Sequence, residues 1–345
     1  MTGSTSPNFA GRAPTATERV LIVRSDGVGD ALALTPLLAA LRDAGHELGA
    51  LLSTRNADAF AQRTFAHVHV LERIPWPHHG STPASAARAR AAARAVGYDV
   101  ALIASEEPEA YRFARALGIA RRTGFGNGLA KPFKSWWIAT QLTRVVRRPA
   151  SVAGAREHEV ETLFALGAGL HAETAPTRSP ARLAPLILDG TPPHHGDVVL
   201  QWTPKFAGLG FDEAAFARCG QTLAQRHRVR LVAERADAVA AERIARTAGV
   251  PCAIPASFAE WKAALAGAAA VVTPDSGAAH VAGMLGVPCV DLFAPSRHAR
   301  REIARWHPWA APYRALGLDA ATLARLDAIV AAACDELLAA SATAP

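Results

Sequence analysis

Short apolar runs alternate with longer amphipathic stretches along most of the chain. Near the start, the run Val20–Val23 predicts a buried strand, the polar turn Arg24–Asp30 follows it, and Ala31–Arg42 has the spacing of a helix that Gly45 closes. His46–Leu52 then predicts a second strand. A strand, a helix and a strand in this order predict a βαβ unit, which is typical of a parallel sheet.

The same alternation continues through the rest of the chain. Further strands are expected at Val68–Leu71, Asp99–Ala104, Arg121–Gly124, Asp197–Leu200, Val229–Val232, Ala268–Val272 and Pro288–Phe293. Further helices are expected at Ser85–Val96, Glu109–Leu117, Asp212–Arg226, Phe258–Leu265, Gly277–Leu285 and Asp319–Ala340. The pattern predicts an α/β fold in which helices cover parallel sheets.

A proline-rich stretch at 171–196 divides this pattern into two halves. We expect one domain at 18–175, a second at 176–312 and a C-terminal segment at 313–345. Residues 1–17 are rich in Ser, Thr, Pro and Ala and lack the apolar core of a signal peptide, so a disordered leader is expected there. With 345 residues, 50% of them hydrophobic, the chain is long enough for two domains with sizeable cores.

Charge and cysteine usage narrow the class of protein. The formal net charge of +7, carried mainly by arginine, indicates an anionic partner: a sugar nucleotide, a phosphorylated glycolipid, a membrane surface or a nucleic acid. No nucleic-acid-binding motif is recognised, so nucleic acid is not expected. The four cysteines lie far apart, which disfavours a zinc site and a disulfide framework and favours a reducing compartment. No apolar window of about 18 residues predicts a membrane-spanning helix.

Two kinds of surface segment remain open to interpretation. His78-His79 and His194-His195 each lie among prolines, where a solvated loop is favoured over a metal site. The stretch Lys131–Arg148 interleaves lysine and arginine with Phe133, Trp136 and Trp137. Such a stretch can dock at an anionic bilayer or around a phosphorylated acceptor, but tryptophan is equally suited to a protein core.

The segment Val271–Ser296 carries the strongest candidate chemistry. Its apolar start predicts a strand, and the polar turn Thr273–Gly277 opens a helix for which Asp275 or Ser276 can serve as N-cap. The helix N-terminus offers free N–H groups that suit a phosphate or a pyrophosphate. Ser276 and His280 are four residues apart and therefore share one helix face. The alternative interpretation is an ordinary capped helix with a chance histidine.

The glycines near the start of the chain invite a dinucleotide interpretation, which the spacing disfavours. Gly27 and Gly29 have the spacing of the first two glycines of G-x-G-x-x-G, but Leu32 occupies the third position. The acidic residue that would bind a ribose is also missing after the second strand, which ends in Ser53-Thr54-Arg55. No G-x-x-x-x-G-K-[ST] loop is present, so no cofactor of these classes is expected.

Two blocks resemble a known family. Asp275-Ser276-Gly277-Ala278-Ala279-His280, followed by Leu285–Pro288 and Leu292–Ser296, is similar to the D-[ST]-G-x-x-H … LG-x-P … LFGP-[ST] block of glycosyltransferase family 9, the ADP-heptose:lipopolysaccharide heptosyltransferases. Ala294 departs from the family's usual glycine. Val20–Val23, Arg24, Gly29-Asp30 and Thr35-Pro36 resemble the opening of the same family.

The resemblance implies the GT-B fold, in which two Rossmann-like domains face each other across a cleft. The first domain would bind the acceptor, the second would bind the nucleotide sugar, and the C-terminal helix would pack back towards the first domain. His158–Glu161 resembles the start of the helix that closes the family's first domain.

The resemblance also assigns roles to single residues. It implies that Asp30 is the general base, although an Asp at this place can simply cap the helix. Substrate binding is implied for Arg24, Gly29, Asp275, Ser276, Gly277 and His280. A looser match points to Thr203 and Lys205 as a phosphate-binding loop and to Glu234 as a ribose ligand.

The function implied is inverting, metal-independent transfer of a heptose or similar sugar from ADP-heptose to an acceptor hydroxyl. The family's common acceptor is lipopolysaccharide core, a phosphorylated glycolipid, so a cytoplasmic enzyme in peripheral contact with the inner membrane is expected. No D-x-D metal motif is present. Three alternatives stay open: a degenerate donor-binding or scaffold protein, a transferase that acts on a protein acceptor, and a sugar-nucleotide epimerase.

Overall fold

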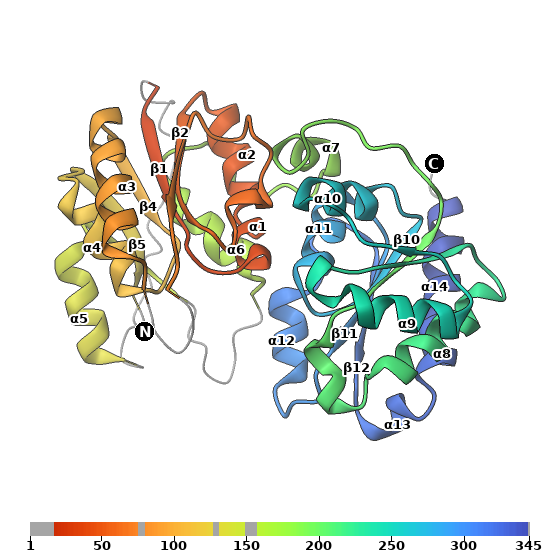
Figure 1. The fold of residues 1–345 in the computed structure, drawn as a ribbon. Helices are drawn as coiled ribbons and strands as arrows, with labels where there is room; N and C mark the ends of the chain where they lie inside the picture. Colours follow the sequence, from red (N-terminus) through yellow and green to blue (C-terminus); the bar gives the residue numbers. More distant parts are fainter. Residues whose placement is uncertain (1–16, 75–79, 127–130, 149–156, 344–345) are drawn as a thin grey trace, which may run out of the picture.

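Two parallel β-sheets, each flanked by helices, form the protein (Figure 1). The computed structural model describes residues 17–74, 80–126, 131–148 and 157–343. The predicted leader and the His78-His79 pair lie outside these ranges, apart from Thr17 at the end of the leader. Every pair of neighbouring strands in both sheets runs parallel. The predicted α/β class is therefore confirmed.

The first sheet has six strands in the order β3-β2-β1-β4-β5-β6. These are β1 (Arg19–Val23), β2 (Glu47–Ser53), β3 (His67–Leu71), β4 (Val100–Ile103), β5 (Arg121–Gly126) and β6 (Arg144–Arg147). Its helices are α1 (Val28–Leu32), α2 (Thr35–Asp43), α3 (Pro83–Val96), α4 (Pro108–Ala116), α5 (Pro132–Gln141) and α6 (Glu159–Phe164). Successive β1 residues pack into different apolar clusters, with α1, α2 and α6 on one face and α3, α4 and α5 on the other.

The second sheet has the order β12-β11-β10-β7-β8-β9. Its strands are β7 (Val198–Gln201), β8 (Val229–Val232), β9 (Cys252–Ala253), β10 (Ala270–Pro274), β11 (Cys289–Phe293) and β12 (Tyr313–Gly317). Its helices are α8 (Glu213–Ala224), α9 (Ala238–Ala248), α10 (Phe258–Ala266), α11 (Gly277–Leu285), α12 (Ala299–Trp306), α13 (Ala320–Leu323) and α14 (Leu326–Ala342). Counted from its own first strand, this sheet repeats the strand order of the first sheet, which is the order of doubly wound dinucleotide folds.

The helix predicted at Ala31–Arg42 is two helices in the structure. The break lies at Ala33-Leu34, before Pro36 near the start of α2. Proline has no N–H to donate to the carbonyl four residues earlier, that of Leu32. The Thr35 hydroxyl donates to this carbonyl instead, at 2.6 Å. Helix α1 begins at Val28, earlier than predicted, and contains Gly29 and Asp30 in its first turn.

The prediction that the C-terminal helix returns to the first domain is wrong. The predicted helix is divided into α13 and α14, and α14 packs on α8 and on strands β10, β11 and β12 of its own domain (Figure 1). Leu326, Val330, Cys334 and Leu337 belong to one apolar cluster with Leu200 and other residues of the second sheet. The stripe of apolar residues on α14 thus covers a sheet face that would otherwise be exposed to water.

The two domains pack directly on each other. One apolar cluster joins Leu32 of α1 and Leu37 of α2 to Ala278 and Val281 of α11. Lys262 of α10, 3% exposed, donates to main-chain carbonyls of the first domain and the connecting segment, among them Asp58 at 2.9 Å and Ile187 at 2.7 Å. The connecting segment adds α7 (Pro180–Leu183), which contacts both α2 and α11.

None of the helices in the described ranges combines the length and the apolar character needed to cross a bilayer.

Candidate functional site

Polar residues gather where the strand order reverses in each sheet. In the first sheet this point lies between β1 and β4, whose carboxyl ends lead into 24–30 and 104–107. In the second sheet it lies between β7 and β10, whose ends lead into 203–205 and 275–276. Doubly wound sheets bind their ligands at such points. The candidate site therefore has one half on each domain.

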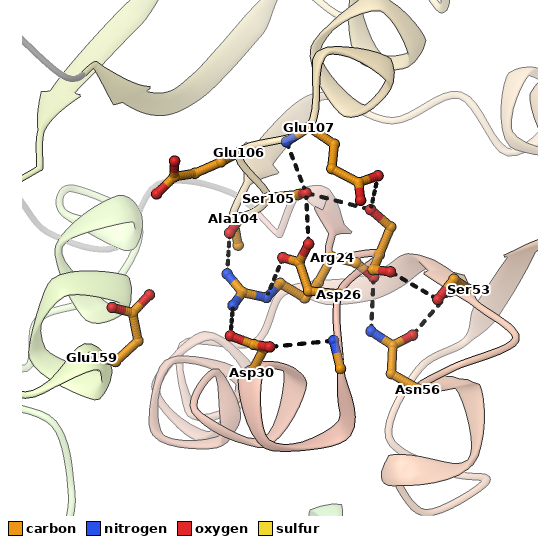
Figure 2. A network of polar contacts seen from close by, with 12 residues as sticks. Arg24, Asp26, Asp30, Ser53, Asn56, Ala104, Ser105, Glu106, Glu107 and Glu159 are labelled. Carbon is orange, nitrogen blue, oxygen red and sulfur yellow. Dashed lines mark hydrogen bonds and ion pairs between the residues drawn. The ribbon is translucent and has the colours of Figure 1, made fainter. Parts of the chain in front are cut away.

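The first half centres on the Asp30 carboxylate (Figure 2). Arg24, 3% exposed, donates from Nη2 to Asp30 Oδ1 at 2.8 Å and from Nη1 to the Ala104 carbonyl of the β4 end. The main-chain N–H of Gly27 donates to Asp30 Oδ2 at 3.3 Å. The Asp30 side chain nevertheless remains 37% exposed. Asp30 thus caps α1, as the alternative interpretation held, and also presents a fixed carboxylate to solvent.

A second carboxylate, Asp26, lies on the other side of the same arginine. Asp26 Oδ2 is 3.1 Å from Arg24 Nε, and its Oδ1 is 3.5 Å from the Ser105 hydroxyl (Figure 2). Burial raises the pKa of Asp26 above its ordinary value, and Arg24 opposes this effect. The negative charges of Asp30 and Glu107 raise it further. Two neighbouring carboxyl groups therefore differ in environment, and the more exposed one is Asp30.

The β1 loop is fastened to its neighbours by further hydrogen bonds. The Asn56 side chain donates to the Arg24 carbonyl at 3.2 Å and accepts the Ser53 main-chain N–H at 2.9 Å (Figure 2). The Ser53 hydroxyl donates to the Ser25 carbonyl at 2.9 Å, and the Ser25 hydroxyl donates to Glu107 at 3.2 Å. These contacts fix the loop in place, which restricts the directions that Asp30 can take.

The second half lies at the start of α11. The Ser276 hydroxyl caps this helix by accepting the Ala278 N–H at 3.3 Å, and it lies 3.1 Å from the Thr273 hydroxyl. Lys205 donates from Nζ to the Asp275 main-chain carbonyl, and its Nζ lies 3.3 Å from Asp275 Oδ2. The structure therefore places an ammonium group beside the N-terminus of α11, and both features attract an anion.

Thr203 holds the segment that carries Lys205. It begins the short helix η5 (Pro204–Leu209), and its hydroxyl accepts the Lys205 main-chain N–H at 3.4 Å. The structure thus brings four predicted residues together: Thr203, Lys205, Asp275 and Ser276.

Gly29 and His280 join the two halves. A Cβ atom on Gly29 would lie 2.3 Å from Cδ2 of the His280 ring, so the ring fits only because this position is glycine. A Cβ atom on Gly277 would likewise lie 3.3 Å from Cγ1 of Val28. Burial lowers the pKa of His280, while the carboxylates of Asp275 and Asp30 raise it. His280 thus interacts electrostatically with both halves of the site.

Glu234 is less closely placed than the other predicted residues. It follows β8 and starts η6 (Arg235–Asp237), on the same edge of the sheet as Lys205 but one strand farther out. Its side chain is exposed.

A buried ionic cluster that the sequence pattern does not predict lies beside Asp30. Glu159, at the first position of α6, has a side chain 1% exposed and pairs with Arg148 at 2.6 Å and with Arg305 of α12 at 2.7 Å. Arg148 also pairs with Glu106 at 2.8 Å. Figure 2 shows Glu106 and Glu159 near Asp30. The sequence signal for this cluster is the His158-Glu159 pair, which by itself indicates only a helix start.

Two hollows in the described chain include neither Asp30 nor Ser276. One, of about 480 Å³, is lined by Trp202, Pro204, Asp212, Asp237 and neighbouring residues, and therefore borders η5. The other, of about 320 Å³, lies in the first domain around Ser81, Arg90 and Glu109. In the described part of the chain, no group of three or more His, Cys, Asp or Glu side chains has a metal-binding arrangement.

Comparisons with known proteins agree with this architecture. The family model described as glycosyltransferase family 9 (heptosyltransferase) matches residues 87–328. No protein of curated function matches the sequence.

Several solved structures have the same fold. The family 9 glycosyltransferase of Veillonella parvula is 14% identical and covers 93% of this chain and 97% of its own, with a TM-score of 0.71. E. coli heptosyltransferase WaaC with ADP is 20% identical, with coverages of 90% and 98% and a TM-score of 0.70. E. coli ADP-heptose lps heptosyltransferase II is 16% identical, with coverages of 92% and 99% and a TM-score of 0.64. The predicted GT-B arrangement is confirmed.

Proposed function

Because the chain belongs to glycosyltransferase family 9, the heptosyltransferase family, we propose that it transfers a heptose or a similar sugar from ADP-heptose to an acceptor hydroxyl, with inversion and without a metal ion. The proposed acceptor is lipopolysaccharide core, reached from the cytoplasmic face of the inner membrane in peripheral contact. One observation carries the proposal: the Asp30 carboxylate and the cationic start of α11 lie on facing domains that meet at Gly29 and His280.

The donor side of the proposal rests on Lys205 and the start of α11. WaaC is described with ADP, and we extend an ADP-type donor to this chain. In the structure, Lys205 donates to the Asp275 main-chain carbonyl and pairs with its carboxylate. We infer that the diphosphate replaces Asp275 as the partner of the ammonium group and accepts N–H groups of α11. These donors would stabilise the negative charge that develops on the leaving diphosphate, each contributing about 2–4 kcal/mol.

The transfer step then needs one proton acceptor. Asp30 takes the proton of the acceptor hydroxyl as its oxygen forms a bond to the anomeric carbon of the sugar. The bond from that carbon to the diphosphate oxygen breaks at the same time, and the nucleoside diphosphate leaves with the electron pair. Attack from the face opposite the leaving group inverts the anomeric centre.

Arg24 acts in this proposal as a positioning residue and not as a substrate ligand. Its guanidinium group is buried and its contacts are the Asp26 and Asp30 carboxylates and the Ala104 carbonyl. Arg24 therefore fixes Oδ1 of Asp30. The Oδ2 atom lies at the N-terminus of α1, where it accepts the Gly27 N–H.

The test is incubation with ADP-heptose and a heptose-free core acceptor, followed by mass spectrometry of the acceptor and assay of released ADP. Transfer to the glycolipid with an inverted linkage in the presence of EDTA supports the proposal. Modification of a protein acceptor alone, isomerisation of the donor without acceptor, or donor binding without turnover would each replace it with one of the three alternatives. A thermal-shift comparison of ADP-, GDP- and UDP-sugars identifies the nucleobase.

The base assignment has its own test. We expect Asp30→Asn to reduce turnover about 10²- to 10⁴-fold while donor affinity is retained. Asp43→Asn, an exposed carboxylate at the end of α2, serves as the control and should leave turnover unchanged. Turnover by Asp30→Asn close to that of the wild type would reject Asp30 as the base.

A further inference from the structure

The outer face of α5 exposes large aromatic side chains to solvent. Phe133 is 88% exposed and Trp136 is 71% exposed, the two highest values among the exposed large hydrophobic residues of the described chain. They are three positions apart and therefore share one face of the helix. Val145 on the adjoining edge strand β6 is 48% exposed.

The inner face of α5 explains why these aromatic residues are not needed in the core. Ile138 is fully buried, and the Trp137 ring packs edge-on against Tyr111 of α4 with ring centroids 6.1 Å apart. Arg112 of α4 lies over the Trp137 ring at 5.3 Å. The helix is thus already anchored by one set of apolar residues, and Phe133 and Trp136 point away from it.

Positive charge surrounds this face. From Ala110 to Arg156 the sequence has ten Lys and Arg residues and no Asp or Glu, although the net charge of the whole chain is only +7. Outside this segment the acidic residues outnumber the basic ones by three. Lys131, Arg112, Arg115, Arg144 and Arg147 are exposed on α4, β6 or the start of α5.

Helix α5 also adjoins the first half of the site, through a side chain on another side of the helix. Lys134 of α5 lies 3.6 Å from Glu106, and Glu106 is bound to Arg148 of the ionic cluster beside Asp30. A surface that docks against α5 would therefore lie next to the half of the site to which the proposed function assigns the acceptor.

We propose that α5 and the end of β6 form a membrane-docking surface for an anionic lipid bilayer, in which Phe133 and Trp136 insert at the level of the headgroups while Lys131, Arg144 and Arg147 contact lipid phosphates. Exposed aromatic residues within a cationic rim match such a bilayer in both polarity and charge. The inference rests on the proposed function in one respect only, namely that a glycolipid acceptor lies in that bilayer.

The test is co-sedimentation of the full chain with vesicles of phosphatidylcholine, with and without about 30% phosphatidylglycerol. We expect binding to the anionic vesicles only, weakened by salt. Phe133→Ser with Trp136→Ser should weaken it at least tenfold, and Lys131→Glu should weaken it about tenfold. The matched controls lie on α9 of the second domain: Val239→Ser, which removes an apolar residue 70% exposed, and Arg246→Glu, which reverses an exposed charge. Both controls should bind as the wild type does.

A second measurement needs no variant. Brominated lipid in the anionic vesicles should quench part of the tryptophan fluorescence of the wild-type chain, because Trp136 would lie in the interface. Absence of quenching, equal binding to neutral vesicles, or unchanged binding by the double variant would overturn the proposal. A dimer in sedimentation velocity that dissociates in the double variant would assign this face to a second copy of the chain instead.

The outcome is separable from that of the proposed function. Transfer to a water-soluble acceptor fragment without acyl chains should be unchanged in the double variant, because neither residue contacts the site. If the wild type binds vesicles but transfers no sugar, the proposed function fails while the docking surface stands.

Discussion

The His280 ring lies against Gly29 so closely that a Cβ atom on the glycine would be 2.3 Å from ring atom Cδ2. Gly29 belongs to the first turn of α1 in the first domain and His280 to α11 in the second. The backbone that carries Asp30 is thus in direct contact with the helix proposed to bind the diphosphate. Because Gly29 has no side chain, the two domains can approach each other this closely.

Gly29→Ala tests this contact. The added methyl group must displace a buried ring, so we expect the free energy of unfolding to fall by about 1–3 kcal/mol and transferase activity to fall with it. The readout is urea denaturation together with the transfer assay. His280→Ala in the same chain removes the clash, so the double variant should be more stable than the sum of the single effects predicts. Additive losses would show that the two residues do not interact.

Lys205→Met tests the diphosphate site. The substitution keeps most of the side-chain volume and removes the ammonium group that the structure places beside the start of α11. We expect the dissociation constant for ADP to rise at least tenfold, since a charge-assisted hydrogen bond is worth about 1.5–3 kcal/mol. Isothermal titration calorimetry measures it. The control is Arg246→Met, which removes a charge in the last turn of α9. This variant should bind ADP as the wild type does. An unchanged affinity in Lys205→Met would remove Lys205 from the donor site.

Glu159→Gln tests the buried ionic cluster. The Glu159 side chain is 1% exposed and its carboxylate pairs with Arg148 of the first domain and Arg305 of the second. The substitution leaves Arg148 with only the half-exposed Glu106 and removes the carboxylate that Arg305 faces. We therefore expect a loss of about 1–3 kcal/mol in the free energy of unfolding.

The control for Glu159→Gln is a surface pair. Glu336→Gln removes the partner of Arg314, and both of those side chains are more than half exposed. Exposed pairs contribute about 0–1 kcal/mol, so this variant should unfold almost as the wild type does in urea. Equal stability losses in the two variants would mean that the cluster does not link the domains.

His158→Asn tests a predicted dependence of stability on pH. The His158 side chain caps α6, and burial lowers its pKa to about 3. An unfolded histidine titrates near pH 6.5. Between these values the unfolded chain binds a proton that the folded chain does not, so stability falls as the pH falls below about 6.5, by about 1.4 kcal/mol per pH unit.

Asparagine keeps the capping function but does not titrate. The slope of the unfolding free energy between about pH 6 and pH 4 should therefore be smaller in His158→Asn by about one proton. Chemical denaturation at a series of pH values measures it, and an unchanged slope would contradict the assignment.

Much of the fold followed from the sequence because its signals are local. The apolar run that became β1 and the glycine that ends α11 were both identified from neighbouring residues alone. The strand β6 was missed because only four residues form it and two of them are arginines, so no apolar run marks an edge strand with this composition. Pro36 is a local signal for the break between α1 and α2. Only the structure shows that the Leu32 carbonyl accepts the Thr35 hydroxyl there.

The sequence by itself determined the chemical groups of the candidate site, since Asp30, Lys205 and Ser276 follow the carboxyl ends of strands, where each parallel sheet places its ligand-binding residues. Only the tertiary structure decided that Arg24 lies behind Asp30, that α14 stays on its own domain and that Glu159 joins arginines from both domains. Hydrophobic periodicity specifies which face of an element is buried, but not which partner buries it. That choice depends on shape and charge between residues far apart in the chain, and these come together only when the two domains pack.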